Sequence, residues 1–230
     1  MLSSKKIICP NNLINIAKKT SGIIAGTEKY SRDLLINLPD LKVISRVGVG
    51  MDNIDINAAN KLSIKLFKSE TTPAPAVAEL VLGLMIDVSR KVSKHNMDLK
   101  SGIWEKKMGN LIQGRTLGII GLGNIGKTLV KLVRGLNFNI LAYDKVKDNN
   151  FIIKNKIKYC DLDYLLKKSD IISIHLNLSD ETRNLIDRTA LDAMKESAIL
   201  VNTARGGIVN EMDLAAALSS NQIAGAGIDV

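Results

Sequence analysis

Residues 115–144, RTLGIIGLGNIGKTLVKLVRGLNFNILAYD, decide the fold of this chain. The stretch opens with an apolar run, Leu117 to Ile120, which suits a strand buried on both faces of a parallel sheet. A glycine turn follows, and apolar residues then recur at helical spacing. A second apolar run, Phe138 to Tyr143, predicts the next strand. Strand, turn, helix and strand in this order indicate a parallel α/β unit.

The turn carries the pattern G-x-G-x-x-G, formed by Gly121, Gly123 and Gly126. The first glycine permits a tight turn, the second lets the backbone approach a pyrophosphate, and the third lets helix and strand pack closely. The backbone N–H groups of Asn124 and Ile125 then lie at the helix N-terminus, where an anion binds. A lone motif of this kind also serves ordinary helix–strand packing, but in this context it predicts a dinucleotide site.

Asp144 ends the second strand, 18 residues after Gly126. A carboxylate at this spacing accepts hydrogen bonds from an adenosine ribose. The same carboxylate repels a ribose 2′-phosphate, so we expect the cofactor NAD rather than NADP. The basic neighbour Lys145 weakens that preference, because it can tolerate the phosphate.

Composition limits the class of protein. With 230 residues, 46% of them hydrophobic, the chain can bury a core and hold one large or two small domains. The net charge of +9 does not predict a nucleic-acid partner, because the lysines are scattered and aromatic residues make up only 3%. No stretch approaches a membrane span. Cys9 and Cys160 fit no metal or disulfide spacing, so we expect reduced, buried thiols, no metal site and a cytoplasmic location.

Before the glycine motif, short strands and helices alternate, which again predicts a parallel sheet. Strands are expected at residues 5–9, 22–26, 42–46 and 62–67, and helices at residues 13–19, 32–38 and 56–61. The strand at 22–26 is expected to be buried. A helix from about Ala76 is apolar almost all round, so we expect it to be buried between two domains or two subunits.

Seven segments resemble, in order and spacing, landmarks of the NAD-dependent D-2-hydroxyacid dehydrogenases, closest to the phosphoglycerate dehydrogenase branch. These segments are SRVGVGMDNID, PAVAELVLGL, SGIWEKKMGN, GRTLGIIGLGNIGK, SDIISIHLNLSDETRNLI, LVNTARGGIVNEMDLAAAL and AGAGIDV. The resemblance implies a doubly wound parallel-sheet (Rossmann) NAD-binding domain at residues 93–230. It also implies an incomplete flavodoxin-like α/β substrate domain at residues 1–92, which includes the linking helix. The helix after Ala76 and the arm around Trp104 resemble elements that pack across a homodimer.

The segment NTARGG follows a predicted strand, residues 197–201, and so reaches the carboxyl edge of the sheet, where ligands bind. Arg205 offers a planar fork to a substrate carboxylate, and the resemblance implies a catalytic role for it, although a surface salt bridge is the simpler alternative. Thr203, Ala204 and Asp229 match family positions that face the cofactor. Asp229 matches the contact to the nicotinamide carboxamide, unless it only caps a strand end.

The segment around residues 46–55 supplies the remaining candidates. Val49 and Gly50 resemble a loop whose backbone N–H groups hold the substrate carboxylate. Arg46 either meets a substrate phosphate or is structural. Asp52 and Asp55 look like a carboxylate pair, but the local sequence favours turn and helix-cap chemistry.

The proton-transfer group is the main departure from the family pattern. His175 is a tempting general base, but the resemblance places it on the cofactor side. The family's glutamate and histidine pair has no counterpart up to Val230, and the family's first strand and helix also have none. We therefore expect a chain truncated at both ends that is inactive as it stands.

Three functions are compatible with these motifs. The first is an oxidoreductase that transfers a hydride between NAD and a D-2-hydroxy acid, with 3-phosphoglycerate as the expected substrate. The second is a catalytically silent NAD-binding module that acts by dimerisation or regulation. The third is a reductase for glyoxylate or hydroxypyruvate, which shares every motif quoted. The motifs fix neither the 2-hydroxy acid nor the direction of reaction.

Overall fold

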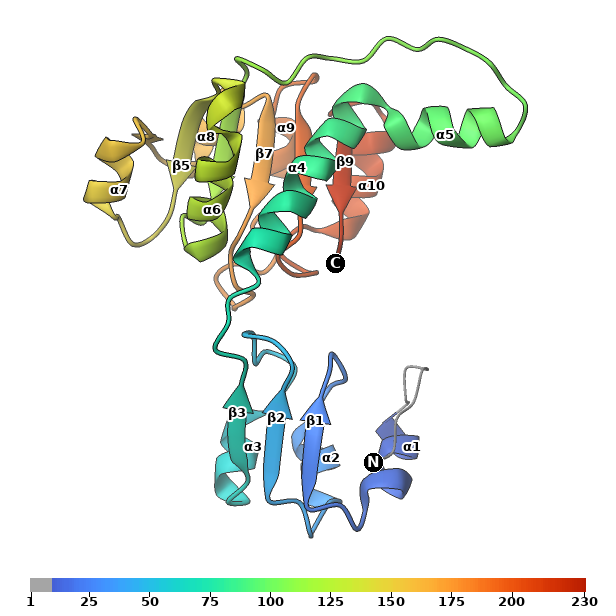
Figure 1. The fold of residues 1–230 in the computed structure, drawn as a ribbon, viewed down its shortest axis with the longest axis vertical. Helices are drawn as coiled ribbons and strands as arrows, with labels where there is room; N and C mark the ends of the chain where they lie inside the picture. Colours follow the sequence, from blue (N-terminus) through green and yellow to red (C-terminus); the bar gives the residue numbers. More distant parts are fainter. Residues whose placement is uncertain (1–9) are drawn as a thin grey trace. The chain divides into compact units, whose positions relative to one another are not determined.

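The computed structural model describes residues 10–230, which form two compact units (Figure 1). The first unit extends to Pro73 and the second runs from Ala74 to Val230. The predicted strand at residues 5–9 and the thiol of Cys9 lie outside the described residues. None of the described helices has the length and apolar character needed to span a bilayer.

The first unit contains a three-stranded parallel sheet in the order β1-β2-β3. Its strands are β1 (Gly22–Ala25), β2 (Val43–Arg46) and β3 (Lys65–Lys68). Its helices are α1 (Pro10–Ala17), α2 (Arg32–Ile36) and α3 (Ile56–Lys61). Residues of all three helices share one hydrophobic core with Ala25 and Ile44 of the sheet. The parallel α/β organisation expected from the alternating elements is therefore present.

The described residues cover only one face of the sheet in the first unit. Ile24, Ser45 and Phe67 are neighbours in register across the three strands, and all three are exposed. Ile24 is 66% exposed, so the expectation of a buried strand at residues 22–26 was wrong. The reason is that the helices pack against Ile44 on the opposite face, which hydrophobicity alone does not reveal.

Helix ends in the first unit follow the capping residues. The Ser31 side chain accepts a hydrogen bond from the Leu34 backbone N–H, and Asp55 accepts one from the Ala58 N–H at 2.8 Å. The cap role expected for Asp55 is therefore confirmed. Strand β3 starts only at Lys65, because Ser63, with φ of +57°, reverses the chain after α3.

The second unit contains a six-stranded parallel sheet in the order β6-β5-β4-β7-β8-β9. Its strands are β4 (Thr116–Ile120), β5 (Asn139–Tyr143), β6 (Lys158–Tyr159), β7 (Ile171–Ile174), β8 (Ile199–Asn202) and β9 (Gly225–Ile228). The chain builds outward from β4 to one side and then from β7 to the other, which is the doubly wound Rossmann topology. The predicted fold class is confirmed.

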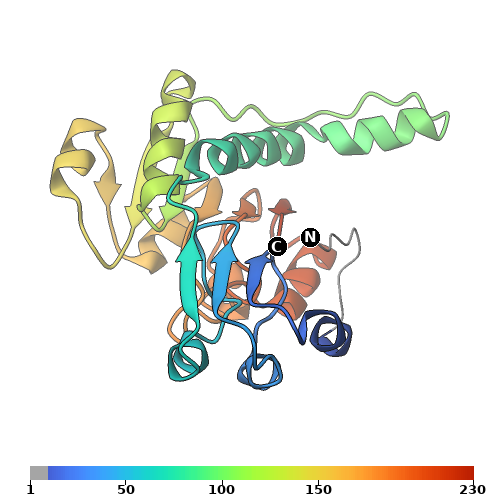
Figure 2. The same cartoon turned by 60° about the horizontal axis from the view of Figure 1, so that its bottom comes forward.

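Helices cover both faces of this sheet (Figure 1). The helices of this unit are α4 (Ala74–Arg90), α5 (Val92–Lys100), α6 (Asn124–Leu132), η1 (Val133–Leu136), α7 (Asn149–Lys154), α8 (Leu162–Lys168), α9 (Arg188–Asp192) and α10 (Glu211–Ser219). Of these, α5 continues beyond the end of α4 and extends away from the sheet (Figure 2). Leu117 and Ile119 of β4 belong to the core with α4 and α6, whereas Ile120 belongs to the core with α8 to α10. Gly118 lets α8 approach closely, because a Cβ there would lie 2.6 Å from Leu165 Cδ2.

Helix α4 sets the border between the units. The sequence placed the border near residue 92, but the compact units meet after Pro73 because α4 packs on α6, β8 and β9. Gly225 and Gly227 leave room for this helix, since a Cβ on each would lie 2.7 Å from Val88 Cγ1 and 3.0 Å from Leu84 Cβ, respectively. The buried face of α4 thus lies within the second unit.

Candidate functional site

The three motif glycines follow β4 and differ in what the protein requires of them. Gly121 has φ of +98°, and a Cβ there would lie 2.7 Å from the His175 carbonyl oxygen. A Cβ on Gly126 would overlap the Gly121 carbonyl oxygen. A Cβ on Gly123 meets no atom within 4 Å. The fold therefore demands the first and third glycines, whereas the open space at Gly123 suits the close approach of a ligand, as a pyrophosphate requires.

Helix α6 begins directly beside this open space. Its N-cap residue is Gly123, which supplies no side-chain cap. The N–H groups of Asn124 and Ile125 therefore face out of the helix end, where the positive end of the helix dipole favours an anion. This arrangement fits the expected dinucleotide.

Asp144 lies beside the glycine loop, although it follows a different strand, β5. Its Oδ2 accepts a hydrogen bond from the Leu122 N–H at 2.6 Å, and its Oδ1 accepts one from the Val146 N–H at 3.0 Å. The Asp144 N–H donates to the Tyr159 hydroxyl at 3.2 Å. Each carboxylate oxygen keeps accepting capacity, so the fixed carboxylate can bind ribose hydroxyls.

Lys145, which the sequence offered as a weak partner for a 2′-phosphate, forms an ion pair with Glu181. Both side chains are exposed, so the pair contributes little to stability. The Glu181 carboxylate nevertheless pairs with the Lys145 ammonium group, which would otherwise attract a phosphate. This pairing is compatible with NAD as the cofactor, and no local motif reveals Glu181 as the partner of Lys145.

The carboxyl end of β8 carries Thr203, Ala204 and Arg205. Thr203 is 8% exposed, and its buried Oγ1 has no hydrogen-bond partner among the described residues. Arg205 is half-buried and donates from Nη1 to the Ala204 carbonyl at 2.6 Å. A buried hydroxyl without a partner is costly, so Thr203 Oγ1 is suited to a polar ligand atom.

Asn202, which precedes this segment, was not among the predicted site residues. Its Oδ1 accepts from the Ala204 N–H at 3.0 Å, and its Nδ2 donates to the Arg205 carbonyl at 3.0 Å. The Asp229 N–H donates to the Asn202 carbonyl at 3.1 Å, which brings the exposed Asp229 beside the same strand end. An asparagine between a strand and small residues is typical of such a turn, and this was the available signal.

His175 follows β7 at the same edge of the sheet. Its Nε2 lies 3.0 Å from the Ser173 hydroxyl, and its buried Nδ1 has no partner in the part of the chain that the structure describes. Burial lowers the pKa of His175 to about 4, so the ring is neutral at pH 7. A ring with this pKa is a poor base near neutrality, which agrees with the expectation that His175 lies on the cofactor side and is not the general base.

The cofactor candidates thus gather at the carboxyl ends of four strands, β4, β5, β8 and β9, which run parallel within one sheet. In doubly wound sheets ligands bind at this edge, near the point where the strand order reverses, which here lies between β4 and β7. The structure therefore brings all of the cofactor candidates to one edge of the second unit.

The first unit holds the other candidates, in the loop after β2. The Val47 N–H donates to the Ala25 carbonyl at 2.9 Å, and the Gly48 N–H donates to Ser69 Oγ at 3.0 Å. Within residues 10–230, the N–H groups of Val49 and Gly50 make no hydrogen bond to a backbone carbonyl. Two consecutive donors of this kind suit a carboxylate.

Arg46 folds back onto this loop. Its Nη1 donates to the Val47 carbonyl, and its guanidinium occupies the space where a Cβ of Gly48 would lie. Gly48 has φ of +138°, a conformation that favours glycine. The arginine therefore supports the loop, and this contact uses one of the guanidinium N–H donors that were expected to bind a substrate phosphate.

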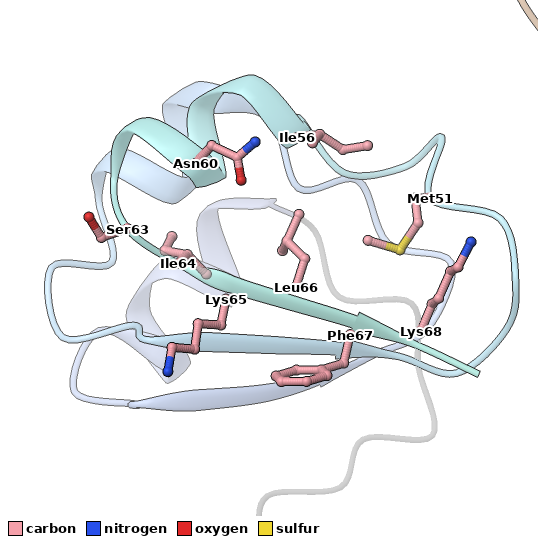
Figure 3. A pocket seen from close by; sticks show the side chains of 9 residues that line it. All are labelled: Met51, Ile56, Asn60, Ser63, Ile64, Lys65, Leu66, Phe67 and Lys68. Atoms are coloured by element: carbon pink, nitrogen blue, oxygen red, sulfur yellow. The ribbon is translucent and has the colours of Figure 1, made fainter. Parts of the chain in front are cut away.

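A hollow of about 550 Å³ lies elsewhere in the first unit, beside α3 and β3 (Figure 3). Met51, Ile56 and Leu66 line it, together with Phe67 and two lysines. None of the predicted site residues lies in its wall. We therefore assign no chemistry to this hollow.

Comparison with known proteins gives consistent matches. Residues 82–230 match the model of the D-isomer specific 2-hydroxyacid dehydrogenase NAD-binding domain. The chain is 39% identical to the hydroxypyruvate reductase of Thermotoga maritima over 210 residues, which is 90% of this chain and 68% of that protein. It is 36% identical to the D-3-phosphoglycerate dehydrogenase of Methanocaldococcus jannaschii, over 90% of this chain but only 40% of that protein.

Solved structures agree. The D-lactate dehydrogenase of Aquifex aeolicus, crystallised with NAD and lactic acid, superposes with a TM-score of 0.85 at 29% sequence identity. The match covers 94% of this chain and 66% of that one. Fold and sequence therefore point to the same group of proteins.

Proposed function

The chain belongs to the D-isomer specific 2-hydroxyacid dehydrogenase family, and we propose that it serves hydride transfer between NAD and a small D-2-hydroxy acid. The observation that carries this proposal is the open space at Gly123, which lies beside a fixed carboxylate, Asp144. Thr203 and Arg205 stand at another strand end of the same edge. Both features are explained by a dinucleotide and a carboxylate ligand.

Each candidate then has a role that its chemistry allows. The N–H groups of Asn124 and Ile125 bind the pyrophosphate, and Asp144 binds the ribose hydroxyls. The nicotinamide ring, when bound, supplies the hydride acceptor or donor. Arg205 binds the substrate carboxylate and the adjacent oxygen through its planar fork. We also assign carboxylate binding to the N–H groups of Val49 and Gly50.

Proton transfer separates an active dehydrogenase from a silent NAD-binding module. The ring of His175 is neutral and bonded to Ser173, and His95 lies on α5, which carries none of the candidate site residues. We therefore expect the 230-residue chain to bind NADH while turning over 2-oxo acids several orders of magnitude more slowly than a protein with a placed base.

The test is a titration of NADH by fluorescence beside an assay of NADH oxidation with glyoxylate and hydroxypyruvate. Slow oxidation that an Arg205→Ala variant abolishes supports the enzyme, and NADH binding with no measurable oxidation supports the silent module. A chain that does not bind NADH contradicts both.

The substrate is the finer question. The expectation of 3-phosphoglycerate came from the resemblance to the phosphoglycerate dehydrogenase branch, and Arg46, whose Nη1 donates to the Val47 carbonyl, is the side chain that could meet its phosphate. A 2-oxo acid without phosphate, such as hydroxypyruvate, is the second candidate, as the 39% identical hydroxypyruvate reductase suggests. Competition between 3-phosphoglycerate and hydroxypyruvate for the NADH complex distinguishes them, and Arg46→Ala should weaken only the phosphorylated ligand if the first candidate is right.

We also propose a homodimer formed through α5 and the arm that follows it, residues 101–113. Apolar side chains on these elements are unusually exposed for a chain that acts alone: Trp104 is 88% exposed, Met108 78% and Leu111 62%. Asp98 holds the arm to α5 through Lys107, with Nζ to Oδ2 at 2.6 Å. A fixed arm with exposed apolar side chains suits a second copy of the chain.

A further inference from the structure

Asn202 is the last residue of β8 and is only 2% exposed. A buried carboxamide is costly unless both of its ends are bonded, and here both are. Its Oδ1 accepts from the Ala204 N–H at 3.0 Å and its Nδ2 donates to the Arg205 carbonyl at 3.0 Å. The side chain thus bridges two peptide groups further along its own chain.

These bonds hold the whole turn that presents Arg205. The Ala204 N–H belongs to the peptide after Thr203, and the Arg205 carbonyl belongs to the peptide before Gly206. The peptide between them is bonded as well, because Arg205 Nη1 donates to the Ala204 carbonyl at 2.6 Å. Each of the three peptide groups from Thr203 to Gly206 therefore takes part in a hydrogen bond, and the Asn202 side chain bonds two of these groups.

We propose that Asn202 is a positioning residue that sets the orientation of the Arg205 guanidinium toward the substrate carboxylate. The proposal rests on the function assigned to Arg205 above. Asn202 touches neither reactant in this role. The glycine loop and Asp144 lie at the ends of other strands, so the adenosine half of the cofactor site does not depend on it.

The test uses the 230-residue chain with NADH and oxalate, a small dicarboxylate that mimics a 2-oxo acid. Asn202→Asp keeps an acceptor for the Ala204 N–H, but its ionised form has no donor for the Arg205 carbonyl. We expect oxalate affinity at about pH 8 to fall about tenfold, while NADH affinity changes less than about threefold. The lost donor returns when the carboxyl is protonated, so the difference from wild type should shrink toward about pH 5.

Asn210→Ala is the matched control. Asn210 also bonds backbone groups, since its Oδ1 accepts from the Met212 and Asp213 N–H groups at 3.1 Å each, but it caps α10. This variant should lower the melting temperature and leave both affinities unchanged. An Asn202→Asp variant that behaves in the same way has lost only stability, and the proposal is then wrong.

Failure of the proposed function is distinguishable. A wild-type chain that binds NADH but not oxalate refutes the substrate class assigned to Arg205. Hydrogen exchange then decides about Asn202: the Ala204 amide must exchange faster in Asn202→Ala than in wild type, while amides of β7 keep their protection. Unchanged exchange at Ala204 overturns the proposal.

Discussion

Replacing Gly123 by alanine should separate cofactor binding from folding. The residue has φ of −76° and ψ of −158°, which alanine adopts without strain. The added methyl group meets no protein atom within 4 Å, so the free energy of unfolding should change by less than about 0.5 kcal/mol, or rise slightly. The same methyl group would occupy the space that we assign to the pyrophosphate.

The loss of affinity can be estimated from the contacts at risk. A methyl group that keeps the pyrophosphate from the N-terminus of α6 removes at least one hydrogen bond to a charged group, worth about 1.5–3 kcal/mol. This corresponds to roughly 10- to 150-fold weaker NADH binding. Gly126→Ala should differ, because its methyl group would overlap the Gly121 carbonyl oxygen and destabilise the fold by about 1–3 kcal/mol.

Calorimetric titration with NADH and urea unfolding of each variant check both quantities. Gly135→Ala is the control, since a Cβ there also meets no atom within 4 Å and the residue lies in η1, beyond the far end of α6. Unchanged NADH affinity in Gly123→Ala, or a loss of stability like that of Gly126→Ala, refutes the assignment of this space to the cofactor.

Three further predictions concern other parts of the second unit. Asp144→Asn removes the charge that repels a 2′-phosphate, so the ratio of NADH to NADPH affinity should fall about tenfold; an unchanged ratio in fluorescence titrations contradicts this role. The pKa of His175 is about 4 in the folded chain and about 6.5 when unfolded, so the unfolded state takes up the proton first as pH falls. The free energy of unfolding of the wild type should therefore fall by about 2 kcal/mol between pH 7 and pH 5. In urea unfolding, His175→Asn should lack this part of the pH dependence. Trp104→Glu should yield monomers in sedimentation, whereas Val146→Glu, at a site 78% exposed, should not; a monomeric wild type excludes the dimer.

Local patterns in the sequence predicted the centre of the second unit well. The strands β4 and β5 and the glycine turn lie within a residue or two of their expected places, because a buried strand, a glycine turn and an amphipathic helix each depend on neighbouring residues. The expected positions of Asp144 and Arg205 at strand ends follow from the same patterns. Family resemblance added the roles of these residues, which their positions alone do not give.

The features that the sequence did not predict depend on contacts between residues far apart in the chain. Helix α4 joined the second unit because Gly225 and Gly227, far along the chain, leave space for it. Glu181 pairs with Lys145 across 36 residues, and no local rule predicts that pairing. Residue type alone suggested a phosphate contact for Arg46 and suggested no role for Asn202. The hydrogen bonds that these side chains make depend instead on the path of each loop.

The distribution of the cofactor candidates has a consequence for melting behaviour. They span residues 121–229 and lie at four strand ends of one sheet, while the first unit supplies none of them and has its own core. By mass action, NADH at about 100 times its dissociation constant adds about 2.7 kcal/mol to whichever unit binds it. Heat capacity scans with rising NADH should therefore move a single transition upward and leave the other in place. The cofactor then labels one cooperative unit of the chain and reveals the intrinsic stability of the other.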